Sequence, residues 1–265
     1  MYAFEYQRPT SVDAAAAATQ GADARFLAGG QSLVQAMKLR LSSAERLIDL
    51  GAVQQLGGIS VSATHVTLGA MARHADVAAS AEVRKAIPAL ADLAGGIGDQ
   101  MVRAMGTIGG SLANADPAAC YPAAVLGLGA TIRTNRREIA GDAFFTGLYE
   151  TALQPGELIV SVSFAIPQRA AYVKFKQPAS RFALVGVVVS QSAGGVRVGV
   201  TGARSHAFRC AELESALAGS FTPAAAAKVK LSSDGMNADL HASAEYRAAM
   251  IVTMAKRAVE AALAR

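Results

Sequence analysis

The sequence predicts an α+β fold, in which a mixed α/β region precedes an antiparallel sheet with C-terminal helices. In the N-terminal half, short apolar runs alternate with apolar residues at helical spacing. After Pro167 to Arg169, three strand candidates follow one another, and Gly194-Gly195 forms a hairpin turn between the last two. A long amphipathic segment, Ser243 to Leu263, predicts a C-terminal helix.

The start of the chain predicts a strand, a helix and a second strand. Arg25 to Ala28 is short and apolar enough for a buried strand. Gln31 to Leu41 has apolar residues on one helical face, namely Leu33, Val34, Met37 and Leu41. Arg46 to Leu50 is the second strand candidate, and Gly51 stops it.

The next segment predicts a hairpin followed by helices. Ile59 to Leu68 alternates apolar and polar residues, as a hairpin does. Ser80 is a candidate N-cap for a helical segment that reaches Leu93 and stops at Gly95-Gly96. Pro88 lies inside this segment and is compatible with two shorter helices. Pro122 suits the first turn of another helix, which ends near Leu128.

The C-terminal part predicts strands and two helices. Leu158 to Phe164 is a strand candidate, and Pro167 to Arg169 marks a domain boundary. The three strands beyond it are Tyr172 to Lys176, Phe182 to Ser190 and Val196 to Thr201. The middle one is almost entirely apolar, as a strand buried on both faces would be. Ala211 to Ala218 predicts a helix that Gly219 closes.

Composition favours a compact globular protein and narrows its partners. Of the 265 residues, 52% are hydrophobic and 17% charged, which argues against disorder. The net charge is +5, and the charges are scattered, so they form either a solvated basic surface or a field that attracts an anionic cofactor or partner. Without Trp and without a basic stripe, the chain does not resemble a nucleic-acid-binding protein.

The cysteines and histidines exclude several kinds of site. Cys120 and Cys210 form no Cys-x-x-Cys motif, and two cysteines cannot hold an iron–sulfur cluster alone. The four histidines lie apart, so we expect no metal ligands and no Ser-His-Asp catalytic group: His65, His74, His206 and His241. We see no export signal and no apolar run approaching the roughly 18–20 residues of a membrane helix, so we expect a cytoplasmic protein.

Two glycine-rich turns are the main functional signal. They are Ala28-Gly29-Gly30-Gln31-Ser32 and Thr107-Ile108-Gly109-Gly110-Ser111. A Gly-Gly pair lets backbone N–H groups approach an anion without interference from a Cβ. Neither turn has the Walker pattern or the Gly-x-Gly-x-x-Gly of a Rossmann site. Together they predict two loops that hold one extended phosphate ligand, such as a dinucleotide.

With these two turns and the stretch Val102 to Pro117, the sequence resembles the FAD-binding medium subunits of the molybdenum hydroxylases, of the xanthine dehydrogenase and carbon monoxide dehydrogenase type. The resemblance spans nearly the whole chain. It includes further segments: Lys38-Leu39-Arg40, Arg46 to Leu50, Gly156 to Ile159, Phe175 to Gln177 and Asp239 to Arg247.

The resemblance implies a domain organisation and a complex. It implies a PCMH-type FAD-binding domain at residues 1–168, with two α/β subdomains at about 1–55 and 56–168. A C-terminal domain at 169–265 would hold a three-stranded antiparallel sheet and helices. This chain would bind FAD, a small subunit would carry [2Fe-2S] clusters, and a large subunit would carry the molybdenum cofactor, as a dimer of heterotrimers. Electrons would pass from the clusters to FAD and then to an external acceptor.

The resemblance also implies cofactor-binding residues. The first turn, Ala28, Gly29, Gly30, Gln31, Ser32 and Leu33, would hold the pyrophosphate and ribityl chain. The second, Thr107, Ile108, Gly109, Gly110 and Ser111, would hold the diphosphate from the other side. Ile97 and Asn114 would contact the cofactor, Ile159 would pack against the adenine, and Lys176 would place a cation near the flavin.

The sequence departs from the family pattern at Cys120 and at Ala104-Met105, where relatives usually carry polar or basic residues. Cys120 stands where many relatives have an aspartate that helps bind the cofactor, and a thiol is a poor hydrogen-bond acceptor. Two other functions stay open at this point. One is a stand-alone FAD oxidase of the same flavin fold, and the other is a scaffold subunit without a cofactor.

Overall fold

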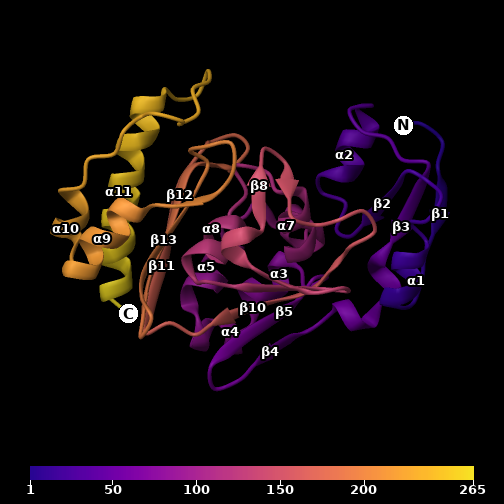
Figure 1. Cartoon of the computed structure of the whole chain (residues 1–265), viewed down its shortest axis with the longest axis horizontal. Coiled ribbons are helices and arrows are strands. Elements are labelled where there is room, and N and C mark those ends of the chain that lie inside the picture. Colours follow the sequence, from indigo (N-terminus) through magenta and orange to yellow (C-terminus); the bar gives the residue numbers. More distant parts are fainter.

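The structure is a computed structural model that describes residues 1–265 and arranges them around three successive sheets (Figure 1). The first sheet lies at one end of the molecule, and the C-terminal helices lie at the other end (Figure 1). The α+β fold predicted from the sequence is therefore confirmed. No helix is both long enough and apolar enough to cross a membrane.

The first unit is a small parallel sheet with two short helices. Its elements are β1 (Glu5–Gln7), α1 (Val12–Ala17), β2 (Ala24–Leu27), α2 (Leu33–Lys38) and β3 (Arg46–Asp49), followed by the 3₁₀ turns η1 (Leu50–Ala52) and η2 (Gln54–Leu56). The strands are ordered β1-β3-β2. The buried core of this unit is small and centres on Ile48 and Leu56, with Leu158 from a later segment.

The second unit is an antiparallel sheet ordered β4-β5-β10-β6-β7. Its strands are β4 (Ile59–Val61), β5 (His65–Gly69), β6 (Thr131–Thr134), β7 (Glu138–Ala140) and β10 (Ile159–Ala165). Its helices are α3 (His74–Ala79), α4 (Ala81–Ala86), α5 (Pro88–Gly95), α6 (Gln100–Met105), α7 (Ile108–Asn114) and α8 (Tyr121–Gly127). The turn η3 (Gly141–Ala143) and the hairpin of β8 (Phe145–Gly147) and β9 (Glu150–Thr151) complete it.

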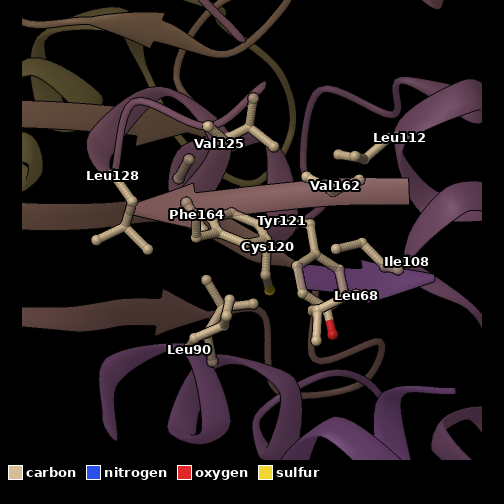
Figure 2. Packing of buried hydrophobic residues seen from close by; sticks show 14 of the residues in the cluster. Leu68, Leu90, Ile108, Leu112, Cys120, Tyr121, Val125, Leu128, Val162 and Phe164 are labelled. Carbon is tan, nitrogen blue, oxygen red and sulfur yellow. The ribbon is translucent and has the colours of Figure 1, made fainter. Parts of the chain in front are cut away.

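The largest hydrophobic core fills the space between this sheet and its helices. Figure 2 shows Ile108 and Leu112 of α7 in one cluster with Val162 and Phe164 of β10. Tyr121 lies fully buried in the same cluster. This packing fixes α7, and with it the second glycine-rich segment, against the middle of the sheet.

The third unit is a twisted antiparallel sheet ordered β11-β12-β13-β14 and covered by helices. Its strands are β11 (Arg169–Lys176), β12 (Ala183–Ser192), β13 (Gly195–Thr201) and β14 (Phe208–Arg209), and its helices are α9 (Ala211–Gly219), α10 (Pro223–Ala227) and α11 (Ala244–Leu263). The three-stranded sheet expected from the resemblance therefore gains a fourth strand. With only two residues, β14 is too short to show an alternating pattern in the sequence.

The strand β12 joins the second and third units. Val187 and Val189 belong to the core under α11, whereas Val188 belongs to the core of the second unit. A Cβ on Gly127 of α8 would lie 2.6 Å from Val188 Cγ1, and one on Gly199 of β13 would lie 2.2 Å from the Ala123 carbonyl oxygen. Glycine at these two positions thus lets α8 lie directly on the sheet. The strand β12 is buried on both faces, which confirms the prediction for the apolar segment Phe182 to Ser190.

One predicted helix is shorter in the structure, and another expectation is confirmed. The helix α2 ends at Lys38, because Arg40 takes a left-handed conformation with φ of 58°, and Leu41 is 79% exposed. The segment from Ser80 to Leu93 forms the two shorter helices α4 and α5 that Pro88 allowed, and α5 begins at Pro88. The strand β1 and the β6–β7 hairpin have no counterpart among the predicted elements.

Candidate functional site

A cleft with a volume of about 520 Å³ lies where the three units meet. The first unit contributes the loop Ala28 to Leu33, and the second contributes α6, the start of α7 and the Ile97 loop. The third contributes Lys174 and the segment Ser180 to Phe182. Residues from distant parts of the chain therefore form one elongated site.

The two glycine-rich segments touch at the centre of this cleft. A Cβ on Gly29 would lie 2.1 Å from the Met105 carbonyl oxygen and 2.8 Å from Gly106 Cα. Gly30 has a φ of 71°, which L-residues rarely adopt. The first turn therefore needs glycine at both positions, one for the close approach and one for the backbone conformation.

The first turn presents a row of free hydrogen-bond donors. The backbone N–H groups of residues 29 to 33 donate to no acceptor within the chain. All five residues line the cleft. Successive unpaired N–H groups favour an anion, because they place partial positive charge on one side of the bound group. The residues present therefore fit a diphosphate.

The second segment is a helix start instead of an open turn. The Thr107 hydroxyl oxygen caps α7 by accepting from the Gly110 N–H at 3.2 Å. The Ile108 and Gly109 N–H groups donate to the carbonyl oxygens of Ala72 at 3.1 Å and Ala70 at 2.9 Å. Ile108 and Gly109 therefore face the core and do not line the cleft, in contrast to the expectation from the resemblance.

One end of the cleft is formed by the first unit and the loop before β10. Thr19, Arg25 and Gly156 line it, together with Glu157. Glu157 accepts hydrogen bonds from the Thr134 hydroxyl at 2.7 Å and from Arg137 Nε at 3.0 Å. Burial raises the pKa of Glu157, but the bonds from Arg137, the Gln154 N–H and Thr134 outweigh it and lower the pKa to about 2.

Ile159 does not reach this end of the cleft. It is 4% exposed and pairs with Thr134 inside the sheet. Its side chain belongs to the core of the second unit. The structure therefore gives no support to a contact between the Ile159 side chain and an adenine ring.

The opposite end of the cleft is organised by Lys174. Its Nζ donates to the carbonyl oxygens of Gly96 and Arg181, both at 2.8 Å, and lies 3.4 Å from Cys120 Sγ. Arg181 Nη1 donates to the Gly98 carbonyl oxygen at 3.3 Å. Lys176 is exposed and does not line the cleft, because β11 has a bulge between Phe175 and Lys176.

His74 lies beneath the second glycine-rich segment. It is 5% exposed, and a Cβ on Gly106 would lie 2.7 Å from its Nε2. Its ring packs against Tyr121 with centroids 5.4 Å apart, and its Nδ1 has no hydrogen-bond partner. Burial, with a smaller contribution from Arg103, lowers the pKa of His74 to about 4. The imidazole is therefore neutral at pH 7.

The structure brings most of the predicted residues into one cleft. Those that line it are Ala28, Gly29, Gly30, Gln31, Ser32, Leu33, Ile97, Thr107, Gly110, Ser111, Asn114 and Cys120. The residues that line the cleft but were not among the predicted site residues include His74, Glu157 and Lys174. Glu157 lies in the motif segment Gly156 to Ile159, whereas His74 and Lys174 carry no local signal in the sequence. The structure contains no group of three metal-ligating side chains.

The chain matches a known protein family. The family described as the FAD binding domain in molybdopterin dehydrogenase matches residues 2–168. The carbon monoxide dehydrogenase medium chain of Hydrogenophaga pseudoflava is 36% identical to this chain, and the match covers 99% of this chain and 98% of that relative. The 6-hydroxypseudooxynicotine dehydrogenase complex subunit alpha of Paenarthrobacter nicotinovorans is 34% identical to this chain, and the match covers 99% of this chain and 95% of that relative.

Solved structures share the fold over the whole chain. A reconstituted CO dehydrogenase from Oligotropha carboxidovorans matches with a TM-score of 0.92 at 34% identity, covering 100% of this chain and 99% of that chain. Quinoline 2-oxidoreductase from Pseudomonas putida 86 matches with a TM-score of 0.90 at 30% identity, and the match covers 98% of this chain and 97% of that chain.

Proposed function

Because the chain belongs to the FAD-binding medium subunits of the molybdenum hydroxylases, we propose that it carries electrons within such a complex. It would take them from [2Fe-2S] clusters of a small subunit and pass them to an external acceptor. Bound FAD supplies the redox chemistry, since it can accept two electrons and release them again. The observation that carries the proposal is the row of free N–H groups at residues 29 to 33.

The residues of the cleft have separate tasks in this proposal. The N–H groups of residues 29 to 33 bind the diphosphate, and Gly29 allows the second unit to approach it. Thr107, Gly110 and Ser111 hold the same group from the other side. Ile97 and Phe182 line the end that carries Lys174, where an apolar ring system fits. No residue of the chain is assigned to substrate chemistry.

The partners in this proposal are a small [2Fe-2S] subunit and a large molybdenum subunit, assembled as a dimer of heterotrimers. The two cysteines of this chain are both buried, and they contribute to separate hydrophobic cores. They cannot ligate a cluster together, so the clusters would belong to another chain. We further propose a division into residues 1–55, 56–168 and 169–265, which is supported by the change of sheet after Ala165 and by the family match that ends at residue 168.

The experiment that tests this function is reconstitution followed by co-purification. We expect the purified chain to bind one FAD, to turn yellow and to release FAD on denaturation. Tagged protein from its native host should bring down a cysteine-rich small chain and a large chain. A chain that binds no FAD would contradict the proposal. A chain that binds FAD but purifies without partners and oxidises a substrate alone would instead be a stand-alone oxidase.

A further inference from the structure

The loop that precedes β10, residues 154–157, closes one end of the cleft and lies between two units. All four of its residues line the cleft. The next residue, Leu158, packs in the core of the first unit, while the chain continues into the second sheet as β10. The position of the 154–157 loop therefore affects the space between the first and second units.

Gly156 brings backbone groups of this loop into the cleft. A Cβ at this position would lie 2.6 Å from Thr19 Oγ1 of the first unit, and the φ of 72° favours glycine. The N–H and the carbonyl oxygen of Gly156 form no hydrogen bond within the chain. A free donor beside a free acceptor suits the edge of a purine base or the hydroxyls of a ribose. This end of the cleft therefore fits the nucleoside half of a dinucleotide.

The Glu157 carboxylate orders the loop and is not left free for a ligand. Its Oε1 accepts from the Thr134 hydroxyl at 2.7 Å and from Arg137 Nε at 3.0 Å. Its Oε2 accepts from Arg137 Nη2 at 3.1 Å and from the Gln154 N–H at 2.9 Å. The side chain is 0% exposed. Because both oxygens already have two donors each, Glu157 acts on a ligand only through the conformation of the loop.

The turn between β6 and β7, residues 134–137, also binds the backbone of this segment. Arg136 Nη2 donates to the Pro155 carbonyl oxygen at 3.0 Å. Arg137 Nη2 donates to the Ala152 carbonyl oxygen at 2.6 Å. No residue of the turn lines the cleft. The turn therefore acts on the cleft from outside, by fixing the 154–157 loop.

We propose that the 134–137 turn positions the 154–157 loop as the wall of a nucleoside subsite, and thereby sets the preference of this cleft for FAD over FMN. The proposal rests on the function proposed above, in which residues 29 to 33 bind the diphosphate and the flavin lies beside Ile97. The nucleoside half of FAD then extends toward Gly156. FMN has no nucleoside half, so it gains nothing from an ordered loop. Thr134 and Arg137 are positioning residues, which touch no ligand.

The test compares the binding of FAD, ADP and FMN to matched variants. Arg137→Met removes the guanidinium from Glu157 and Ala152, so the loop loses its fixed position. FAD binding should weaken about tenfold. ADP carries the same nucleoside and diphosphate and should weaken by the same factor, whereas FMN should bind the variant and the wild type equally. Flavin fluorescence measures FAD and FMN, and competition with FAD measures ADP.

Two further variants control for charge and for folding. Arg133→Met removes the same charge from the same hairpin, but Arg133 is exposed and lies outside the cleft, so all three affinities should stay unchanged. Thr134→Val keeps the shape of the side chain and removes one donor to Glu157. It should weaken FAD and ADP but not FMN. Circular dichroism checks that each variant is folded, and Thr134→Val decides the matter if Arg137→Met does not fold.

The outcomes separate this proposal from the function on which it rests. A wild-type chain that binds no FAD contradicts the proposed function. A wild type that binds FAD but not ADP shows that this end adds no affinity, and it overturns the subsite alone. An equal loss of FAD and FMN affinity in folded Arg137→Met also overturns it, because the turn would then be merely structural. An equal loss in Arg133→Met does the same, since the effect would follow net charge.

Discussion

Glycine at position 29 determines how closely two separate parts of the chain approach each other. The missing side chain allows backbone atoms of the first unit to lie on the carbonyl oxygen of Met105. Because the neighbour is backbone, it cannot rotate away as a flexible side chain would. The fit of the cleft around an elongated ligand thus depends on a single methyl-sized space.

Replacing Gly29 with Ala should weaken FAD binding about 10- to 100-fold, because the added Cβ would lie 2.1 Å from the Met105 oxygen. Isothermal titration of the apo chain with FAD measures this effect. The control is Gly219→Ala, since no atom lies within 4 Å of a Cβ at that position. Equal affinity in Gly29→Ala and wild type would contradict the close approach.

His74 should make the protein sensitive to acid. Burial lowers its pKa to about 4 in the folded state, below the value of about 6.5 in an unfolded chain. The unfolded state therefore binds more protons between these values, so stability is lost as pH falls from about 6.5 towards 4, by about 3 kcal/mol. Urea unfolding of the wild type and of His74→Gln at pH 7 and pH 4.5 checks this.

The glutamine variant should lose less stability on acidification than the wild type. His65→Gln is the control, because His65 is exposed and should leave the pH dependence unchanged. If the free energy of unfolding of His74→Gln fell with pH as steeply as that of the wild type, His74 would not be the cause of the acid sensitivity.

The sequence predicted the loop of the first unit that lines the cleft, but it predicted fewer of the lining residues from the second and third units correctly. The first turn was predicted because Gly-Gly before a hydroxyl residue is a local signal. Ile108 and Gly109 were assigned to the cofactor, but their N–H groups bond to Ala70 and Ala72, which are far away in the sequence. Lys176 was assigned from the family resemblance, and it lies outside the cleft because a bulge between Phe175 and Lys176 interrupts the strand, which the sequence does not show.

Among the elements, those with a complete local pattern could be predicted from the sequence. The strands β2 and β3 and the helix α11 carry enough apolar residues at regular spacing to identify themselves. The strand β14 could not be found, because its two residues are a strand only through pairing with Gly199 and Val200. The parallel order β1-β3-β2 likewise depends on contacts between segments that are distant in sequence.

A buried arginine of the helix α11 forms hydrogen bonds to its sheet, in addition to the apolar contacts of the core. Arg247 is 3% exposed, and its Nη1 donates to the carbonyl oxygens of Leu184 and Gly202, both at 2.8 Å. Its Nη2 donates to Asp239 at 2.7 Å. The arginine therefore joins the helix, two strand ends and the preceding loop.

Replacing Arg247 with Leu should cost about 3–5 kcal/mol of folding free energy, because it leaves two buried carbonyl oxygens and one carboxylate without their partner. Guanidinium unfolding measures this loss. Arg257→Leu is the matched control on the same helix, since Arg257 is exposed and forms no ion pair. Similar losses in both variants would show that the effect belongs to the helix surface and not to the buried contacts.

In the whole molecule, the three units have cores of very different size. The first unit has the smallest buried cluster, and the second unit has the largest. Less buried apolar surface means less stabilisation, so the first unit should open more easily than the others. A ligand that binds between units stabilises only the closed arrangement.

Hydrogen exchange should therefore show two levels of protection in the apo chain. Amides of β3 should exchange faster than those of β12, which is buried on both faces. FAD at 100 times its dissociation constant should add about 2.7 kcal/mol of protection, mainly to the first unit. Mass spectrometry of exchanged peptides measures both effects. Uniform protection without FAD would contradict the order of stability.

The contact between Gly29 and the backbone at Met105 and Gly106 also constrains how a cofactor can enter. No side chain stands between the two segments, so no rotamer change can widen the gap. Widening this contact would therefore require the backbone of one unit to move relative to the other. The spacing between the two loops is set by backbone contact, so the cleft has a fixed width at this point.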